Sequence, residues 1–256
     1  MRQLLTIAIA STLLSVARPC LADDDNTIST DRPNITNSPD VVGTGTIQLE
    51  TGLSGVSTTG LHASSTPTML RLGVGDSIEL RLSGNGRESV HGGGVDTSGW
   101  GGYQLGAKWH ISGGTENGAP AMALIATVIP SSGSAAFRVP GTRTEVDMPL
   151  NWDLGGGYSL GVMPGVYHDH DATGRSGWGS VVSASVGHDL AEHVQGFAEL
   201  AALQLAPARL GGNIVAADIG ATWQPQPNWQ LDFALFRGIS HDAPDWQWSI
   251  GGGIKF

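Results

Sequence analysis

The chain has 256 residues and a net charge of -10, and its composition excludes several classes of protein. The acidic excess argues against a nucleic-acid partner, because phosphates attract a basic surface. One Cys cannot build a disulfide framework or a Cys-based metal site. No run of about 18 apolar residues occurs, so a helical membrane span is excluded. The 38 Gly residues, without a collagen-like period, indicate many tight turns and strands.

Residues 1–22 have the layout of a cleaved secretory signal peptide. Arg2 precedes an apolar run from Leu4 to Ala17 that is too short to cross a bilayer, and Cys20-Leu21-Ala22 resembles a cleavage site. The alternative is an uncleaved N-terminal helix. Residues 23–45 are polar and contain Pro33 and Pro39, so we expect an irregular periplasmic segment there.

From residue 46 onward, apolar and polar residues alternate. Ile78, Leu80 and Leu82, for example, are separated by Glu79 and Arg81. A period of two predicts strands with one apolar and one polar face. Connections after the third, fifth and seventh segments are long and polar, whereas several others are short, as in a meander of hairpins. We predict twelve strands, near 46–57, 62–75, 77–84, 98–112, 119–131, 143–154, 158–169, 177–190, 194–206, 211–224, 229–240 and 245–256.

Two closures of such strands compete. In a soluble barrel or sandwich the apolar face points inward to a packed core, whereas in a membrane barrel it points outward to lipid. Strands of about 9–15 residues suit a tilted crossing of the hydrocarbon. Charged residues recur on the opposite face and are candidates for lining a lumen: Glu50, Arg71, Glu79, Arg81, Lys108, Glu145, Asp147, Glu199, Asp218 and Asp232.

Tryptophans stand near strand ends on the apolar face, as interfacial aromatic girdles require. They are Trp109, Trp152, Trp178, Trp223, Trp229, Trp246 and Trp248. These features together predict an all-β, twelve-stranded antiparallel up-and-down transmembrane β-barrel over residues 46–256.

The cost of placing a cation in lipid defines the strand register. A slip of one residue would turn Arg71, Arg81 and Lys108 toward lipid, at about 2–4 kcal/mol for each at the bilayer midplane. Arg237 is an exception, because it has the parity of the apolar face; either it snorkels at the outer rim or Gly238 marks a bulge. Phe256 ends an alternating apolar segment and resembles the C-terminal signal that the barrel assembly machinery of bacteria recognises.

Several motifs resemble a family of bacterial outer-membrane proteins described as "transporter" or "putative MetA-pathway of phenol degradation". The first block is Asp31-Arg32-Pro33, Ser38-Pro39 and Gly45-Thr46-Ile47-Gln48-Leu49-Glu50-Thr51-Gly52. Later matches include Leu70-Arg71-Leu72-Gly73, Leu105-Gly106-Ala107-Lys108 and Ala243-Pro244-Asp245-Trp246. The resemblance covers nearly the whole mature chain. It implies a Gram-negative outer-membrane barrel linked to uptake of aromatic or other hydrophobic small molecules, and it carries over no catalytic residue.

The polar face has two interpretations. Its charges could line a cation-favouring pore or bind a polar solute, or they could form cross-strand ion pairs that fill the interior. A twelve-stranded barrel lies between side-chain-filled barrels and open porins, so we expect a narrow lumen for small solutes. The segment from Asp31 to Asp40 could plug this lumen from the periplasm, bind a partner, or remain a disordered leader.

Two further clusters have alternative interpretations. His168-Asp169-His170-Asp171 could hold a divalent ion or form a solvated outer loop. Ser180, His168 and Asp169 could form the nucleophile, base and orienting group of a lipid hydrolase at the outer rim, or could be ordinary rim residues.

The function that these observations favour is passive passage of small molecules, hydrophobic or aromatic compounds among them, through a channel in the bacterial outer membrane. We expect no cofactor. The expected partners are outer-membrane lipids, the barrel assembly machinery and a small-molecule solute, and no nucleic acid. The alternatives are a lipid-modifying hydrolase of the outer membrane and a closed structural or adhesive barrel.

Overall fold

A computed structural model describes residues 27–115 and 118–256, so the predicted signal peptide lies outside the described residues. Within these two ranges, no helix is long and apolar enough to span a membrane. The described helical structure is one short 3-10 turn, Ala208–Leu210, and nearly everything else that is regular is strand. The chain is therefore an all-β protein.

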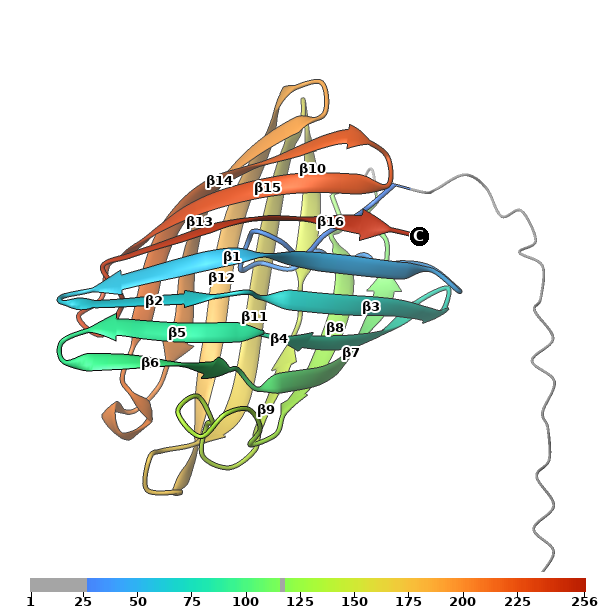
Figure 1. The fold of residues 1–256 in the computed structure, drawn as a ribbon. Helices are drawn as coiled ribbons and strands as arrows, with labels where there is room; N and C mark the ends of the chain where they lie inside the picture. Colours follow the sequence, from blue (N-terminus) through green and yellow to red (C-terminus); the bar gives the residue numbers. More distant parts are fainter. Residues whose placement is uncertain (1–26, 116–117) are drawn as a thin grey trace, which may run out of the picture.

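The strands of the described residues form one antiparallel sheet that closes on itself when β1 pairs with β16 (Figure 1). Each strand otherwise pairs mainly with its neighbours along the chain, as in an up-and-down meander. The strands are β1 Ile47–Thr58, β2 Leu61–Ser65, β3 Thr68–Gly75, β4 Ile78–Gly84, β5 Arg87–Gly92, β6 Val95–Trp100, β7 Tyr103–Ser112, β8 Ala121–Ile129, β9 Arg143–Asp147, β10 Leu150–Gly155, β11 Tyr158–His170, β12 Ser176–Ala191, β13 Val194–Leu205, β14 Ile214–Gln226, β15 Trp229–Gly238 and β16 Trp246–Lys255.

Four consecutive strand pairs are single crossings that a short break divides: β2 and β3, β4 and β5, β6 and β7, and β9 and β10. Sixteen described strands minus four breaks leaves twelve crossings, so the predicted twelve-stranded barrel is confirmed. The breaks before β3 and β10 contain Pro67 and Pro149, which have no backbone N–H to donate to the sheet.

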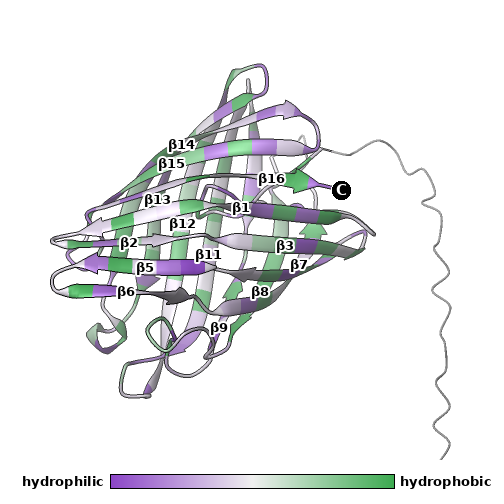
Figure 2. Cartoon of the chain, viewed as in Figure 1, coloured by the Kyte–Doolittle hydropathy of each residue, from purple (hydrophilic) through white to green (hydrophobic). Residues whose placement is uncertain are grey.

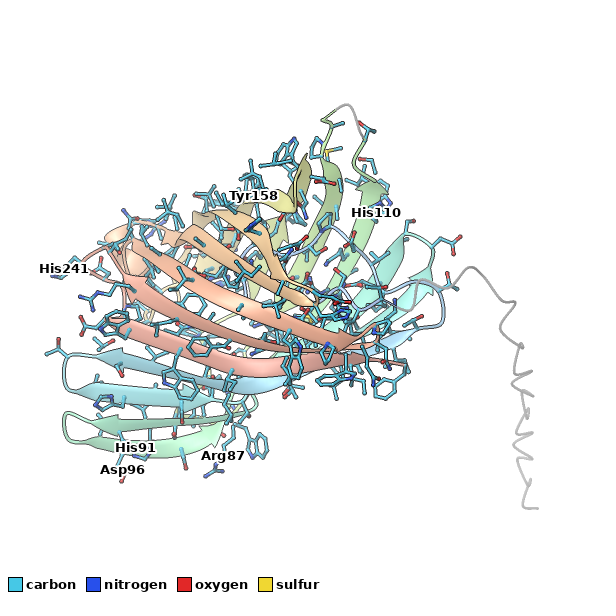
Figure 3. The ribbon with its side chains drawn as sticks, turned by 90° about the horizontal axis from the view of Figure 1, so that it is seen from above. Arg87, His91, Asp96, His110, Tyr158 and His241 are labelled. Carbon is cyan, nitrogen blue, oxygen red and sulfur yellow. The ribbon has the colours of Figure 1, made fainter. Side chains whose placement is uncertain are left out.

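One predicted loop is wrong. The polar segment after residues 77–84 continues as the hairpin of β5 and β6, which turns at Gly93 and Gly94, both with positive φ. Together with β2 and the end of β1, this hairpin forms a sheet that projects beyond the barrel mouth (Figures 1 and 3). Both of its faces lie outside the lipid, so its residues need no apolar alternation. The alternation rule therefore could not detect these strands.

Hydrophobic and hydrophilic residues alternate along the barrel strands (Figure 2). The apolar side chains lie exposed on the outward face and the polar ones face inward, the reverse of a soluble barrel. Leu80 is 48% exposed on the outside, while its neighbours Glu79 and Arg81 are buried on the inside. The same reversal holds for Leu70 and Leu72 around Arg71. Such a surface is stable only against acyl chains. The soluble alternative is therefore excluded.

The connections differ at the two ends of the barrel. Residues 76–77, 156–157, 192–193 and 227–228 make short turns at the end where β1 begins and β16 ends, and we call this end the turn side. Longer connections, such as 130–142 and 206–213, lie at the other end, the loop side. In outer-membrane barrels the short turns face the periplasm.

Tryptophans of the predicted girdles lie at both ends of the outward face. Trp223 and Trp229 meet edge to face near the turn side, with ring centroids 5.9 Å apart. At the loop side, Arg237 lies 4.8 Å from the ring centroid of Trp246, its direct partner in an unbroken β15–β16 register. Gly238 therefore marks no bulge between these strands, and Arg237 occupies the outer rim. The backbones of Phe256 and Ile47 form two hydrogen bonds with each other where β1 meets β16. The role of Phe256 in assembly stays a prediction.

Candidate functional site

Residues 27–42, which we call the plug segment, lie inside the barrel. The segment enters at the turn side, where the Ile28 N–H donates to the carbonyl of Pro227 at 2.6 Å. It leaves at the same end, where the Gly45 N–H donates to the carbonyl of Gly73 at 2.9 Å. Ile28 and Val42, at the two ends, and Asp31 and Thr36 between them are all buried. Residues 27–42 of the predicted periplasmic segment therefore form a loop that enters the lumen from the turn side.

Asp31 is the first anchor of the plug segment. Lys108 Nζ on β7 donates to both carboxylate oxygens of Asp31, at 3.0 and 2.9 Å, and Arg81 on β4 forms an ion pair with the same carboxylate. Burial alone would raise the pKa of Asp31, but the charges of Lys108, Arg71 and Arg81 outweigh burial and hold the pKa well below its usual value. Asp31 is therefore an ionised carboxylate in the centre of the barrel.

Asp31 neutralises the excess positive charge of the surrounding barrel wall. Arg71 on β3 pairs with Glu50 at 3.0 Å and with Glu79 at 2.8 Å. Arg71 also lies directly opposite Arg81 in the β3–β4 register, an arrangement of like charges that is destabilising by itself. With Lys108, this part of the wall carries three cations and two carboxylates, so Asp31 brings its net charge to zero. The plug segment thus supplies the missing counterion.

Arg32 is the second anchor and has the opposite charge. Its Nη2 donates to Asp232 Oδ1 on β15 at 3.0 Å and to Ser249 Oγ on β16 at 2.9 Å. Gly52 and Gly251 face each other across the β1–β16 seam, and a Cβ on them would lie 2.6 and 2.4 Å from Arg32 Nη2. The two glycines therefore leave the space that the guanidinium occupies.

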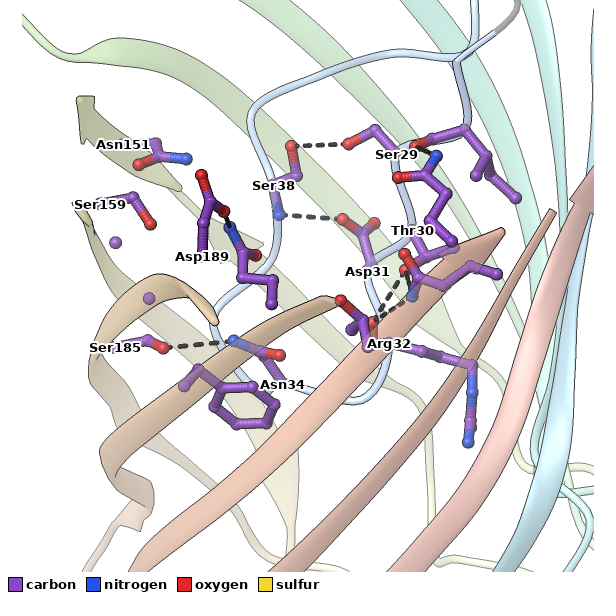
Figure 4. A pocket seen from close by; sticks show the side chains of 18 of the residues that line it. Ser29, Thr30, Asp31, Arg32, Asn34, Ser38, Asn151, Ser159, Ser185 and Asp189 are labelled. Atoms are coloured by element: carbon purple, nitrogen blue, oxygen red, sulfur yellow. Dashed lines mark hydrogen bonds between the residues drawn. The ribbon is translucent and has the colours of Figure 1, made fainter. Parts of the chain in front are cut away.

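The third anchor holds the tip of the plug segment to the opposite wall. The backbone N–H groups of Ile35 and Thr36 donate to Glu199 on β13, at 2.8 and 2.7 Å. Asn34 donates to Ser185 Oγ on β12 at 3.2 Å, as Figure 4 shows. Backbone donors aimed at one buried carboxylate fix the tip in a defined orientation.

Three inward-facing glutamines that the sequence analysis missed also hold the plug segment. The side chain of Gln48 donates to the carbonyl of Ser29, that of Gln224 to the carbonyl of Ile28, and that of Gln230 to Thr30 Oγ1. The sequence signal that could have identified them was an uncharged amide side chain at an inward position of a predicted strand. An amide there donates a hydrogen bond to a backbone carbonyl without adding a buried charge.

Two cavities remain beside the plug segment. The turn-side cavity has a volume of about 520 Å³ and lies between the segment and the wall from β10 to β15 (Figure 4). The loop-side cavity has a volume of about 150 Å³ and includes Arg81, Glu145 and Asp147 in its lining. Asn37, near the tip of the plug segment, lines both cavities. Its side chain donates to Met163 Sδ on β11 at 3.3 Å.

The predicted lumen-lining residues all face inward, but the structure places them around the plug segment rather than around an open pore. Glu50, Arg71, Glu79, Arg81 and Lys108 surround Asp31. Glu145 and Asp147 line the loop-side cavity. Asp232 holds Arg32, and Asp218 lies opposite Glu199 in the β13–β14 register. Both interpretations left open for the polar face bear on this result: cross-strand ion pairs such as Arg71 with Glu79 fill part of the interior, and the plug segment neutralises the remaining wall charge.

The predicted hydrolase residues do not converge. His168 faces outward and packs edge to face with Trp178, at 5.2 Å between ring centroids. Asp169 follows on the inward face and lies 3.5 Å from Arg143, so it cannot orient His168. Ser180 shares the outward face with His168 on the neighbouring strand, as expected, but no hydrogen bond joins the two in the described structure. Alternation separates Asp169 from His168 and His170, whose rings meet edge to face at 5.6 Å between centroids. No group of three His, Cys, Asp or Glu residues with metal-site geometry occurs in the described part of the chain.

The barrel with its plug segment was compared with known proteins. Residues 30–256 match the model of the family described as "Putative MetA-pathway of phenol degradation". The chain belongs to this family. The match begins at Thr30, so it includes most of the plug segment as well as the barrel. No curated protein matches the chain.

Solved outer-membrane barrels share the fold at low sequence identity. The COG4313 outer membrane channel from Pseudomonas putida F1 has a TM-score of 0.58 and 14% identity, over 88% of this chain and 99% of that one. The KdgM porin in complex with disordered oligogalacturonate has a TM-score of 0.53 and 10% identity, over 82% and 99%. The NanC porin has a TM-score of 0.53 and 11% identity, over 82% and 100%. The chain thus has the fold of bacterial outer-membrane channels.

Proposed function

We propose that this protein is a passive channel of the bacterial outer membrane for small molecules. The observation that carries the proposal is that Asn37 lines both the turn-side and the loop-side cavity. The side-chain and backbone hydrogen bonds of the plug segment reach strands on most of the wall, but none reaches β8, β9 or β10 within the described residues. The proposed route passes along this part of the wall.

The mechanism is diffusion down a concentration gradient past Asn37. The route is narrow because the plug segment takes the centre of the lumen, and it is polar because ionised and amide side chains line both cavities. It therefore suits single small solutes rather than polymers. The family description refers to phenol degradation, which favours small aromatic compounds as one class of solute. The similarity to channels and porins, rather than to enzymes, supports the same function.

Single-channel recording in planar lipid bilayers tests the proposal. We expect a small, steady conductance for the wild type, a larger one for Asn37→Gly and a smaller one for Asn37→Phe, because only the cross-section between the cavities changes. Asn85→Ala, at the exposed break between β4 and β5, is the matched control and should conduct like the wild type. A wild type and an Asn37→Gly variant that both fail to conduct would instead favour a closed barrel.

A further inference from the structure

The loop-side cavity has the size of a small-molecule site. Its volume of about 150 Å³ equals that of an engineered protein cavity that holds benzene, about 150 Å³. Met69 and Ile125 line it beside the polar side chains of Asn37, Gln104 and Thr127. A molecule with an apolar body and one polar end therefore fits this lining.

The charges around the cavity are not balanced. Arg81 lines the cavity but pairs with Asp31 and lies 3.6 Å from Glu79. Glu145 pairs with Arg143 at 2.7 Å, and the other acid near Arg143 is Asp169 at 3.5 Å. Asp147 is only 7% exposed, and no ion pair to it occurs among the described residues. The described residues provide no cation within ion-pair distance of this carboxylate, although Arg143 and Arg81 attract it from further away.

One carboxylate oxygen of Asp147, Oδ1, is a buried acceptor without a donor in the described structure. The carboxylate lies against Gly165 on β11, where a Cβ would be 1.9 Å from Oδ1. A buried acceptor without a donor is costly, and a buried charge without a partner is more costly still. A ligand that brought a positive group to this carboxylate would lower the cost of the buried charge.

We propose that the loop-side cavity binds a small primary ammonium compound, with Asp147 as its counterion. The ammonium pairs with the Asp147 carboxylate, Glu145 adds a second negative charge close by, and the apolar part of the ligand contacts Met69 and Ile125. This proposal rests on the proposed channel function only in that the site lies on the same route. It makes the cavity a selective site for small organic cations.

Isothermal titration of the full chain in detergent micelles tests the site, with n-butylammonium and the uncharged 1-butanol as probes. We expect the wild type to bind n-butylammonium at least about tenfold more tightly than 1-butanol. Asp147→Asn keeps the shape of the side chain and should abolish this preference. Asp153→Asn, an exposed acid near the turn end of β10, is the matched control and should keep it. Equal binding of the two probes by the wild type, or an unchanged preference in Asp147→Asn, overturns the proposal.

A second variant and a comparison of binding with conductance distinguish a misfolded variant from a wrong proposal. If Asp147→Asn does not fold, as judged by loss of heat-modifiable migration in detergent gels, Gln104→Phe fills the cavity without touching the carboxylate and should abolish binding of both probes. Binding needs no flux, so a chain that binds n-butylammonium but never conducts refutes the channel alone. A chain that conducts but does not distinguish the probes refutes the ammonium site alone.

Discussion

Lys108 Nζ donates to both carboxylate oxygens of Asp31, at 3.0 and 2.9 Å, and both side chains are buried. Lys108 also donates to the carbonyls of Ser38 and Asp40, at 2.7 and 3.1 Å. One wall side chain therefore binds the plug segment near its beginning and near its end. The barrel and the plug segment therefore form a single electrostatic unit.

Asp31→Asn should release the plug segment. The change leaves Lys108 and Arg81 as buried cations without their shared anion, and breaking a buried ion pair in this way costs about 3–5 kcal/mol. We expect a larger single-channel conductance and a lower temperature for the heat-induced shift in gel migration. Asp96→Asn, on the exposed β5–β6 hairpin, is the control and should change neither. Wild-type conductance in Asp31→Asn would show that the plug segment does not depend on this anchor.

The low pKa of Asp31 predicts how the channel responds to acid. A carboxyl whose pKa is lower in the folded protein contributes stability that is fully present above its unfolded pKa, about 3.9, and is lost as the pH falls through the lower, folded pKa. Conductance should therefore stay constant from neutral pH down to about pH 4 and rise only below it. Recordings across this range check the prediction. A rise that begins near neutral pH would show that another group controls the plug segment.

Gly251→Ala should disturb the Arg32 anchor without changing any charge. The new Cβ would lie 2.4 Å from Arg32 Nη2 and equally close to the carbonyl of Thr51, so the guanidinium must move away from Asp232. We expect faster hydrogen exchange of the backbone amides in residues 28–42, measured by mass spectrometry. Gly113→Ala is the control, because a Cβ at Gly113 meets nothing within 4 Å. Equal exchange in the two variants would contradict the space-filling role of Gly251.

One substitution that introduces an arginine and one that removes an arginine test the orientation of the outward face. Ile219 is 60% exposed in the middle of β14, and Ile219→Arg should destabilise the barrel in lipid vesicles by about 2–4 kcal/mol. Arg237→Ala removes only rim contacts: the cation–π contact with Trp246, worth about 0.5–1 kcal/mol at an exposed site, and a hydrogen bond to the carbonyl of Asp245 at 2.9 Å. Reversible denaturant unfolding in vesicles measures both. A small effect of Ile219→Arg would mean that this position does not face acyl chains.

The barrel could be predicted from the sequence because lipid imposes an apolar residue at every second position. The strand prediction fails where that constraint ends. β5 and β6 are strands, but both of their faces lie outside the membrane. Their apolar residues, such as Val90 and Val95, are too few to produce an alternating pattern. The proline breaks at Pro67 and Pro149 left the alternation on either side intact, so they did not disturb the predicted crossings.

The wall charges of the candidate site could also be predicted, but their partners could not. Period-two alternation shows that Arg71, Arg81 and Lys108 face inward, and it contains no information about what neutralises them. The partner of Lys108 is Asp31, and Arg32 pairs with Asp232, which lies 200 residues further along the chain. A useful signal was present in the wall itself, whose central cluster carries one more cation than anions.

The position of Arg32 has a consequence for how the barrel is completed. Gly52 and Gly251 belong to the first and last strands, and the guanidinium lies against both where these strands meet. The two terminal strands can come together in their final register only around this side chain, which they then hold in place. The closure of the β1–β16 seam and the position of the plug segment are therefore structurally coupled.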